Sequence, residues 1–403
     1  MGEFSELIHD RLQMTATMAA EAAQLLCKED AKSEEAELGC MPPSLQLDPL
    51  LDGGYTEKEY EMMERDRGKY LLYMVALQKA VEDMLTDDEQ PVRVAVVGCG
   101  RGRLIEMALD ASPRVNVWAV DCNSLAVEAC KERFRDNPRV VIKGPAKVSP
   151  RGDNASIFGP DVASQCDIMV SELLGSFACN EFAPEIAVPA AKAILKPGRS
   201  ITIPTRWTAY AVPVCCPAAH RICGGKSGFY MFSLVGDAYL FGEPRAMWSS
   251  GGGSDDVVYL SISGVGSTKL SKAEAWSIEA EQPPAEGGSR KRRHEETRDD
   301  SSCVIHGLAG YFTADLYGGV VIDTRLNAGQ RNCMHWESMF FPLPEPIRLP
   351  DGSEVSYRVR RCTALWGTEL WYEWSVVKGD QKALDRKSVA IHNEGGEAHK
   401  VRL

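Results

Sequence analysis

The sequence predicts an α/β domain with a parallel sheet, followed by a domain of antiparallel β-strands. Strand-like and helical runs alternate between residues 55 and 203, which is typical of a parallel sheet with helical crossovers. From residue 204 to residue 403, short alternating segments separated by turn residues favour an antiparallel sandwich or barrel. Residues 1–54 are predicted to form an N-terminal helix and an acidic linker. A chain of 403 residues is long enough for both domains to bury a core.

Helical spacing dominates the start of the chain. A helix is predicted over 14–26, followed by an acidic stretch at 27–38 and a proline-containing linker. Between 56 and 85, aromatic and apolar residues recur at helical spacing, with a break expected at Gly68.

The parallel sheet is predicted from three apolar runs. Strands are expected at 92–97 and 115–120 with a helix at 104–111 between them, which makes a βαβ unit. A third strand is expected at 166–170. A short helix is then predicted over 189–195, with its proline in the first turn.

The second half contains alternating runs and one polar insertion. Residues 281–302 are charge-dense and are expected to be disordered, and their basic run 289–294 fits either a nuclear address or a solvated loop. Strands are predicted at 207–214, 257–263, 304–313, 320–325, 355–361 and 370–377.

Composition restricts the partners and the compartment. The net charge of −12 argues against direct binding to nucleic acid and favours encounter with basic partners such as Arg- or Lys-rich tails. No apolar run approaches the ~20 residues of a membrane-spanning helix. The 13 unevenly spaced cysteines fit free thiols in a reducing compartment, so a cytoplasmic or nuclear protein is expected, without a metal site.

A glycine-rich turn follows the first predicted strand. Gly98 and Gly100 permit a tight turn and close backbone approach, and Asp121 ends the next strand, where it can accept hydrogen bonds from ribose hydroxyls. These features fit a dinucleotide or S-adenosyl-L-methionine. Arg101 can pair with a free amino-acid carboxylate, which only S-adenosylmethionine carries, so methyl transfer is favoured over hydride transfer.

Two carboxylates follow the third predicted strand. Glu172 stands at its carboxyl end, and a bend at Gly175 would bring Glu181 back beside it. Two carboxylates that face one pocket repel each other and need a cation between them, and a planar guanidinium can accept one on each side. The pair therefore predicts an arginine substrate, with a solvated acidic loop as the alternative on spacing alone.

Several motifs carry a family resemblance from about Tyr60 to the C-terminus. The sequence resembles the protein arginine N-methyltransferases and is most similar to their symmetric-dimethylating (type II) branch. The motifs are residues 60–70, the glycine turn 98–102, the double-Glu loop 171–185, and residues 306–312, 371–374 and 391–393.

The resemblance implies a Rossmann-like class I methyltransferase domain followed by a β-barrel domain that binds substrate. It implies catalytic roles for Glu172 and Glu181, which would hold the guanidinium. It implies cofactor contacts from Tyr60, Lys69, Tyr70, Gly98, Gly100, Arg101 and Asp121. It implies substrate contacts from Met63, Ser171, Leu173, Phe177 and Trp336. The expected substrates are arginine-containing proteins with Gly-Arg-rich or histone tails, and the expected products are symmetric dimethyl- or monomethylarginine.

The sequence departs from the symmetric branch in ways that affect its product and its cofactor contacts. Met63 stands where symmetric enzymes have phenylalanine, and His335 stands where they have serine, so the product type stays open. The acid that meets the adenine amino group is not evident. Pro145 and Ala146 occupy the aligned stretch, and Asp153 in the following insertion is the candidate.

Two further alternatives concern partners and activity. The N-terminal barrel domain of the symmetric enzymes is not expected in this sequence, so their β-propeller partner cannot be carried over, although a homo-oligomer is compatible with the resemblance. An inactive paralogue that regulates another methyltransferase is the alternative function. The second domain disfavours a small-molecule methyltransferase.

Overall fold

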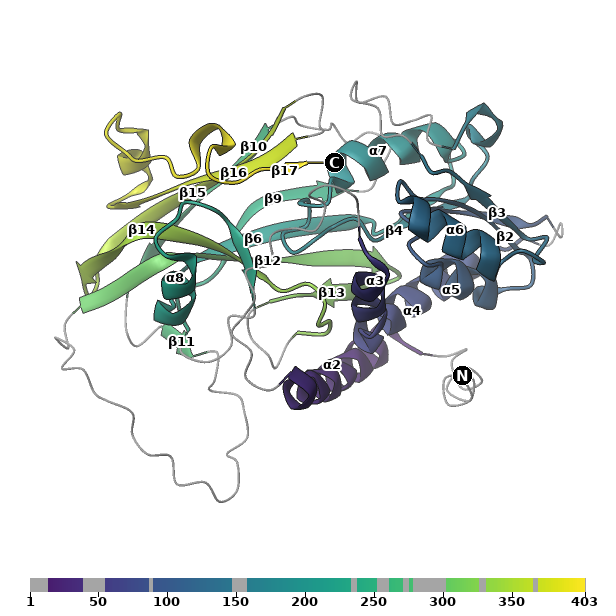
Figure 1. Cartoon of the computed structure of the whole chain (residues 1–403), viewed down its shortest axis with the longest axis horizontal. Helices are drawn as coiled ribbons and strands as arrows, with labels where there is room; N and C mark the ends of the chain where they lie inside the picture. Colours follow the sequence, from purple (N-terminus) through teal and green to yellow (C-terminus); the bar gives the residue numbers. More distant parts are fainter. Residues whose placement is uncertain are drawn as a thin grey trace, which may run out of the picture.

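The structure is a computed structural model with a parallel-sheet half and an antiparallel half (Figure 1). The predictions for residues 1–13, for most of the linker, for Asp153 and for most of the insertion lie outside the residues that it describes. Those residues are 14–38, 55–86, 90–146, 158–232, 238–251, 261–270, 275–277, 302–325, 331–364 and 369–402.

Five parallel strands form the first sheet, in the order β3-β2-β1-β4-β5. The central strand β1 is fully apolar on its buried positions. It pairs with β2 on one side, as the predicted βαβ unit requires, and with β4 on the other. The order reverses between β1 and β4, which is where open α/β sheets bind ligands. The strands are β1 (Val92–Val97), β2 (Val115–Val120), β3 (Val140–Lys143), β4 (Ile168–Ser171) and β5 (Ile201–Ile203).

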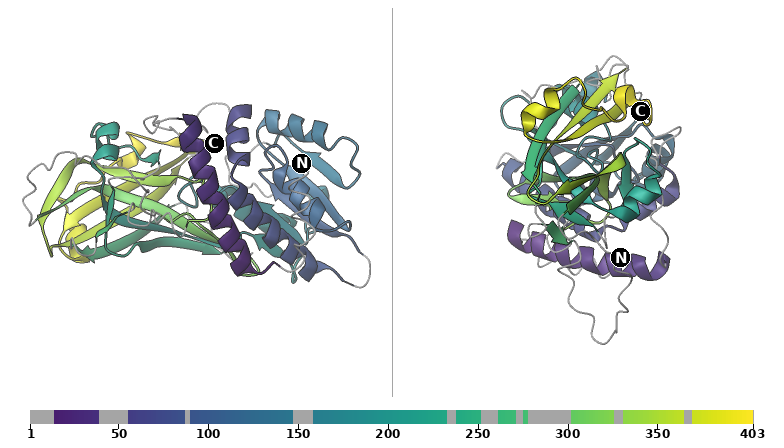
Figure 2. Two further views of the ribbon diagram at one scale, coloured as in Figure 1. Left: turned by 90° about the horizontal axis from the view of Figure 1, so that it is seen from below. Right: turned by 90° about the vertical axis from the view of Figure 1, so that its left-hand side faces the viewer.

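Helices cover this sheet and lie between the two halves. The long helix α2 packs on both α4 and β13, so it joins the two halves of the molecule (Figure 2). None of the helices in the described ranges is long and apolar enough to cross a membrane. The helices of the first half are α2 (Ala16–Leu38), α3 (Glu57–Glu64), α4 (Arg67–Met84), α5 (Arg103–Ala111), α6 (Ser124–Arg133), α7 (Ala183–Ile194) and the 3₁₀ turn η3 (Pro160–Val162).

Three helix boundaries differ from the predictions. Helix α2 continues through the acidic stretch because Arg67 of α4 binds Asp30 (Nε–Oδ1, 2.6 Å) and neutralises part of its charge. The break before α4 falls at Asp66, whose carboxylate accepts a hydrogen bond from the Lys69 amide. Gly68 instead permits close packing, since a Cβ there would lie 2.7 Å from the Asn332 carbonyl oxygen.

Helix α7 begins six residues before the predicted start, at Ala183. Pro184 occupies its first turn and Pro189 lies inside it, so the prediction took an interior proline for an initial one. The backbone enters the helix through Phe182 in a left-handed conformation (φ 62°), which sequence periodicity does not reveal.

The antiparallel half consists of an eight-stranded and a four-stranded sheet. In the larger sheet, β12 is the central strand and pairs with β6 and β14, and β13 and β9 add to this sheet. The strands are β6 (Arg206–Cys215), β7 (Tyr230–Phe232), β8 (Tyr239–Phe241), β9 (Arg245–Gly251), β11 (Ala275–Ser277), β12 (Ser302–Tyr317), β13 (Val320–Asp323) and β14 (Ser338–Pro350). Helix α8 (Pro217–Cys223) packs against it.

The smaller sheet has the order β10-β15-β16-β17. Its strands are β10 (Ser261–Lys269), β15 (Glu354–Ala364), β16 (Glu369–Lys378) and β17 (Val401–Arg402), and the 3₁₀ turns η6 (Gln381–Asp385) and η7 (Glu394–Gly396) follow β16. Strand β14 was not predicted because it contains Pro342, Pro344 and Pro346. Beyond Phe340 it no longer pairs with β7, and Pro344 and Pro346 lie between the paired residues Pro342 and Ile347, where its register with β12 shifts.

Candidate active site

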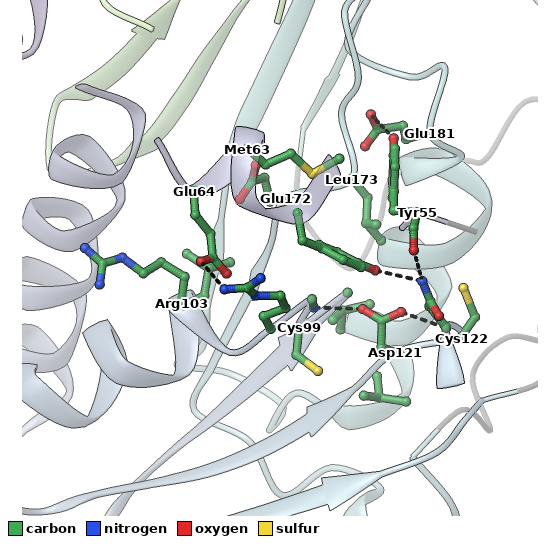
Figure 3. Close-up of a pocket in the computed structure, with 18 of the residues that line it drawn as sticks. Tyr55, Met63, Glu64, Cys99, Arg103, Asp121, Cys122, Glu172, Leu173 and Glu181 are labelled. Atoms are coloured by element: carbon green, nitrogen blue, oxygen red, sulfur yellow. Dashed lines mark hydrogen bonds and ion pairs between the residues drawn. The ribbon is translucent and has the colours of Figure 1, made fainter. Parts of the chain in front are cut away.

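A cavity opens at the carboxyl ends of β1, β2 and β4, where α3 and the loop 331–337 meet them. In the view of Figure 3, Met63, Glu172 and Glu181 lie in its upper part and Asp121 lies below. Most of the predicted site residues line this one cavity: Tyr60, Met63, Tyr70, Gly98, Gly100, Arg101, Asp121, Glu172, Leu173, Glu181 and Trp336.

The glycine turn forms one wall of the cavity. Gly98 has a φ of 76°, and a Cβ there would lie 2.8 Å from the Leu173 side chain. Gly100 has a φ of 50°, and a Cβ there would lie 3.2 Å from the ring of Tyr60. Because other residues would be strained and would crowd these neighbours, glycine leaves the backbone open to a ligand at this point.

Asp121 lies at the end of β2, as predicted, and two backbone amides fix its carboxylate. The amides of Gly100 and Asn123 donate to its two oxygens at 2.8 Å and 2.9 Å. Burial raises the pKa of Asp121, and the hydrogen bonds from the amides lower it in part. An ionised carboxylate has lone pairs beyond those two bonds, so it can accept ribose hydroxyls as well.

Arg101 of the glycine turn pairs with three glutamates of helix α3. Its guanidinium forms ion pairs with Glu64 at 3.3 Å and Glu61 at 3.4 Å, and a longer one with Glu57 at 3.9 Å. Helix α3 has no fully buried residue. These ion pairs therefore attach α3 to the glycine turn, and Arg101, the residue predicted to bind the cofactor carboxylate, also lines the cavity.

Glu172 forms a salt bridge with Lys69, whose ammonium is fully buried. Burial lowers the pKa of Lys69, but Glu172 and its other anionic neighbours raise it by more, so the lysine stays charged. Lys69 does not line the cavity. It lies behind Glu172, with its Nζ 5.2 Å from the ring centre of Trp336, so it orients this carboxylate.

Glu181 accepts a hydrogen bond from the hydroxyl of Tyr55 at 3.1 Å. The backbone oxygen of Tyr55 in turn accepts from the side chain of Asn123 at 2.8 Å, and the same amide nitrogen donates to the hydroxyl of Tyr60 at 3.3 Å. A chain of hydrogen bonds thus joins the second carboxylate to the Asp121 end of the cavity. Tyr55 and Asn123 were not predicted as site residues from the sequence. Asn123 carries the local signal of a helix N-cap after β2.

The loop 331–337 forms the wall opposite the parallel sheet. Asp66 accepts hydrogen bonds from the amides of Met334 and His335, both at 2.7 Å, and so joins this loop to the start of α4. Arg331 donates to the carbonyls of Cys333 and Trp336 within the loop. Burial and the nearby cations Lys69 and Arg331 hold the pKa of His335 well below its usual value, so its ring is neutral at pH 7.

Two predicted substrate contacts lie outside the cavity. Ser171 is buried at the end of β4, and its carbonyl accepts from the Tyr73 hydroxyl at 2.9 Å. Phe177 is fully buried, with its ring centre 4.9 Å from that of Trp248. Both predictions followed the motif's sequence positions, whereas Ser171 is still part of the buried strand β4 and the turn at Gly175 directs Phe177 into the core. At the Asp121 end of the cavity, the wall includes Cys122 and Ala146, the second of which belongs to the stretch aligned with the adenine-binding acid.

Two family models match successive parts of the chain. The model described as PRMT5 arginine-N-methyltransferase matches residues 40–203, and the model described as PRMT5 oligomerisation domain matches residues 206–401. The chain belongs to the PRMT5 family. This confirms the resemblance to the symmetric-dimethylating branch.

Relatives of this PRMT5-family chain include protein arginine N-methyltransferase 5 from Oryza sativa subsp. indica, which is 28% identical over 373 residues and matches 89% of this chain and 50% of its own length. The Xenopus laevis protein of that name is 26% identical, over 89% of this chain and 52% of its own. Protein arginine N-methyltransferase skb1 of Schizosaccharomyces pombe is 26% identical, over 84% and 52%. The chain thus spans about half the length of these relatives.

Solved structures confirm the fold of the PRMT5-family chain. The PRMT1 enzyme–prozyme heterotetrameric complex with AdoHcy from Trypanosoma brucei contains a chain that matches with a TM-score of 0.60 at 16% identity, over 85% of this chain and 98% of its own. Arabidopsis thaliana protein arginine methyltransferase 10 matches with a TM-score of 0.60 at 14% identity, over 84% and 97%. The expected class I methyltransferase sheet followed by antiparallel strands is therefore correct.

Proposed function

We propose that this protein transfers a methyl group from S-adenosyl-L-methionine to a guanidinium nitrogen of arginine in other proteins. The observation that supports this most strongly is that Glu172 and Glu181 line the same cavity as the glycine turn and Asp121. A cofactor site and a cation site thus share one space. Membership of the PRMT5 family agrees with this assignment.

The cavity wall fits the cofactor. Asp121 would receive the ribose hydroxyls, and the open backbone at Gly98 and Gly100 would face the methionine portion. When bound, S-adenosylmethionine supplies an electrophilic methyl group on a sulfonium. The protein's contribution is to hold a guanidinium nitrogen in line with that methyl group.

The charges around the clamp match one guanidinium. Glu172, Glu181 and the Lys69 that pairs with Glu172 carry one net negative charge together. A single arginine side chain balances that charge. The guanidinium is a poor nucleophile with a pKa above ~12, so its orientation by two carboxylates matters more than removal of its proton beforehand. As the new N–C bond forms and the C–S bond breaks, one carboxylate takes the released proton.

The product and the substrates are proposed to follow the symmetric branch, with symmetric dimethyl- or monomethylarginine in Gly-Arg-rich or histone tails. The acidic net charge of −12 favours such basic segments. Met63 lines the cavity beside the carboxylates and shapes the space around the accepting nitrogen. Fragmentation of a methylated peptide in a mass spectrometer distinguishes the symmetric from the asymmetric product.

Assembly and location are proposals as well. The family model over 206–401 describes an oligomerisation domain, which supports assembly with further copies of this chain or with a relative. Light scattering after size-exclusion chromatography tests it, and a monomer would contradict it. A cytoplasmic or nuclear location follows from the cysteine content, and imaging of the tagged protein tests that proposal.

The function itself is tested by incubation with labelled cofactor and Gly-Arg-rich or histone-tail peptides. Label incorporated at arginine is the expected result. Calorimetry with S-adenosylmethionine separates the alternative: a chain that binds neither the cofactor nor its demethylated product would be an inactive regulatory partner.

A further inference from the structure

The loop that carries Glu181 has a strained backbone. Within residues 175–182, Gly175, Ala178 and Phe182 all adopt the left-handed conformation, with φ values of 62°, 66° and 62°. Two of the three are not glycine, and such residues rarely adopt this conformation unless their surroundings hold them there. The position of Glu181 in the cavity therefore depends on what holds the loop.

Contacts inside the loop hold its first turn. The side chain of Asn180 accepts a hydrogen bond from the Phe177 amide at 2.8 Å. A Cβ at Gly175 would lie 2.4 Å from the same asparagine side chain, so the turn closes tightly around it. These contacts fix the curl of the loop, but they do not fix where the loop lies relative to the rest of the cavity.

A fully buried arginine from the other half of the molecule binds the loop on both sides of Glu181. The guanidinium of Arg361, on β15, donates to the two carboxylate oxygens of Glu185 at 2.7 Å and 2.8 Å. The same Nη2 donates to the carbonyl of Cys179 at 3.0 Å. Cys179 precedes Glu181 by two residues, and Glu185 lies in the first turn of α7 just after it.

Aromatic side chains of the antiparallel half also pack against the loop that carries Glu181. Phe177 packs against Phe341 and Trp248, with ring centres 5.3 Å and 4.9 Å apart. The thiol of Cys179 lies 3.4 Å from the hydroxyl of Tyr372. Side chains of the antiparallel half thus set the position of the loop that carries Glu181. Among them, Arg361 makes the charged hydrogen bonds to Glu185 and the Cys179 carbonyl.

The buried Arg361–Glu185 ion pair is better explained by the geometry that it fixes than by the stability that it contributes. A buried ion pair contributes little stability compared with apolar residues of similar size, because both charges lose their hydration. A bidentate guanidinium fixes the distance and the direction of its partner, which apolar contacts do not. We propose that Arg361 is a positioning residue that sets the place of Glu181 in the clamp, and this inference rests on the proposed methyltransferase function.

Two conservative substitutions test the proposal. Arg361→Lys keeps the charge but cannot hold Glu185 and the Cys179 carbonyl in the same fork, and Glu185→Gln turns one amide hydrogen towards the guanidinium. The matched control is Arg360→Lys, because Arg360 is the neighbouring residue of the same strand, is 53% exposed and has a longer ion pair of 3.6 Å.

The proposal predicts a fall in kcat by about tenfold or more for both variants, per active site counted by binding of S-adenosylhomocysteine. The dissociation constant of S-adenosylhomocysteine should stay within about twofold, because Arg361 contacts no residue of the glycine turn in the part of the chain described here. Arg360→Lys should match the parent protein. A role in stability alone would lower the unfolding midpoint and leave kcat per site unchanged, which would overturn the proposal.

Hydrogen exchange supplies a readout that does not need activity. Amides of residues 177–181 should exchange about tenfold faster in Arg361→Lys and Glu185→Gln, while the amides of β1 should be unaffected. If the parent protein transfers no methyl group, the proposed function fails, and faster exchange confined to this loop still supports the positioning role. Unchanged exchange in both variants overturns it. If one variant does not fold, the other carries the test.

Discussion

Glutamine substitution at each clamp carboxylate separates the two glutamates by their effect on stability. Glu172→Gln removes the anion that faces Lys69, whose side chain is 0% exposed, and leaves a buried ammonium without its charged partner. Breaking a buried ion pair in this way costs about 3–5 kcal/mol. Glu181→Gln weakens the hydrogen bond from the Tyr55 hydroxyl at 3.1 Å, which costs about 1 kcal/mol. The two variants should therefore differ by about 2–4 kcal/mol in their free energies of unfolding.

Both variants should lose turnover by about 100-fold or more, because either change leaves the guanidinium held on one side only. The measurements are urea unfolding and methyl transfer to a Gly-Arg-rich peptide at saturating cofactor. Glu132→Gln is the control, since Glu132 is 66% exposed, pairs with Arg135 and does not line the cavity. Equal unfolding midpoints for the two clamp variants would refute the assigned role of Lys69. Full activity in either one would refute the clamp itself.

Three further changes probe the Asp121 end of the cavity, the attachment of the loop 331–337 and a buried histidine of β12 outside the cavity. In Asp121→Asn, the side-chain NH₂ group would face one of the two backbone amides that now donate to the carboxylate. Calorimetry should show S-adenosylhomocysteine binding weakened by about tenfold or more, and unchanged affinity would contradict the ribose assignment. Asp66→Ala removes the acceptor for two backbone amides of the loop 331–337. The KM for the peptide should rise while the cofactor affinity stays within about twofold, and an unaltered KM would contradict this prediction. Burial lowers the pKa of His306 to about 4. As the pH falls, the unfolded state therefore takes up a proton on this histidine before the folded state does, and the free energy of unfolding should decrease between pH 6.5 and about pH 4. His306→Asn should flatten that fall, and an equally steep fall would argue against it.

The glycine turn and Asp121 could be predicted because their signals are local. The glycines follow one apolar run, and the acid ends the next. Once both runs are strands of one parallel sheet, these residues must lie together at the carboxyl edge of that sheet. The loop of Glu172 could be placed at the same edge for the same reason. These residues fall where the periodicity of the sequence is strongest.

The partners of the carboxylates could not be predicted because they lie far away in the sequence. Lys69 is 103 residues from Glu172, and Arg361 is 176 residues from Glu185. No spacing rule connects such pairs, and a lysine near a cofactor motif looks the same whether it faces a ligand or a glutamate. The placement of Phe177 failed for a related reason, since one left-handed residue at Gly175 redirects everything after it.

The two buried ion pairs, Lys69–Glu172 and Arg361–Glu185, together hold the two carboxylates of the clamp at a set separation. Lys69, at the start of α4, holds Glu172 from the parallel half of the molecule, and Arg361, on β15, holds the loop of Glu181 from the antiparallel half. The separation of the two carboxylates is therefore set by how the halves pack, with α2 lying against both. A substitution at that packing surface would alter the clamp without touching it. Under the proposed function, the antiparallel half thus contributes to catalysis by setting the place of Glu181, in addition to supplying Trp336 to the cavity wall.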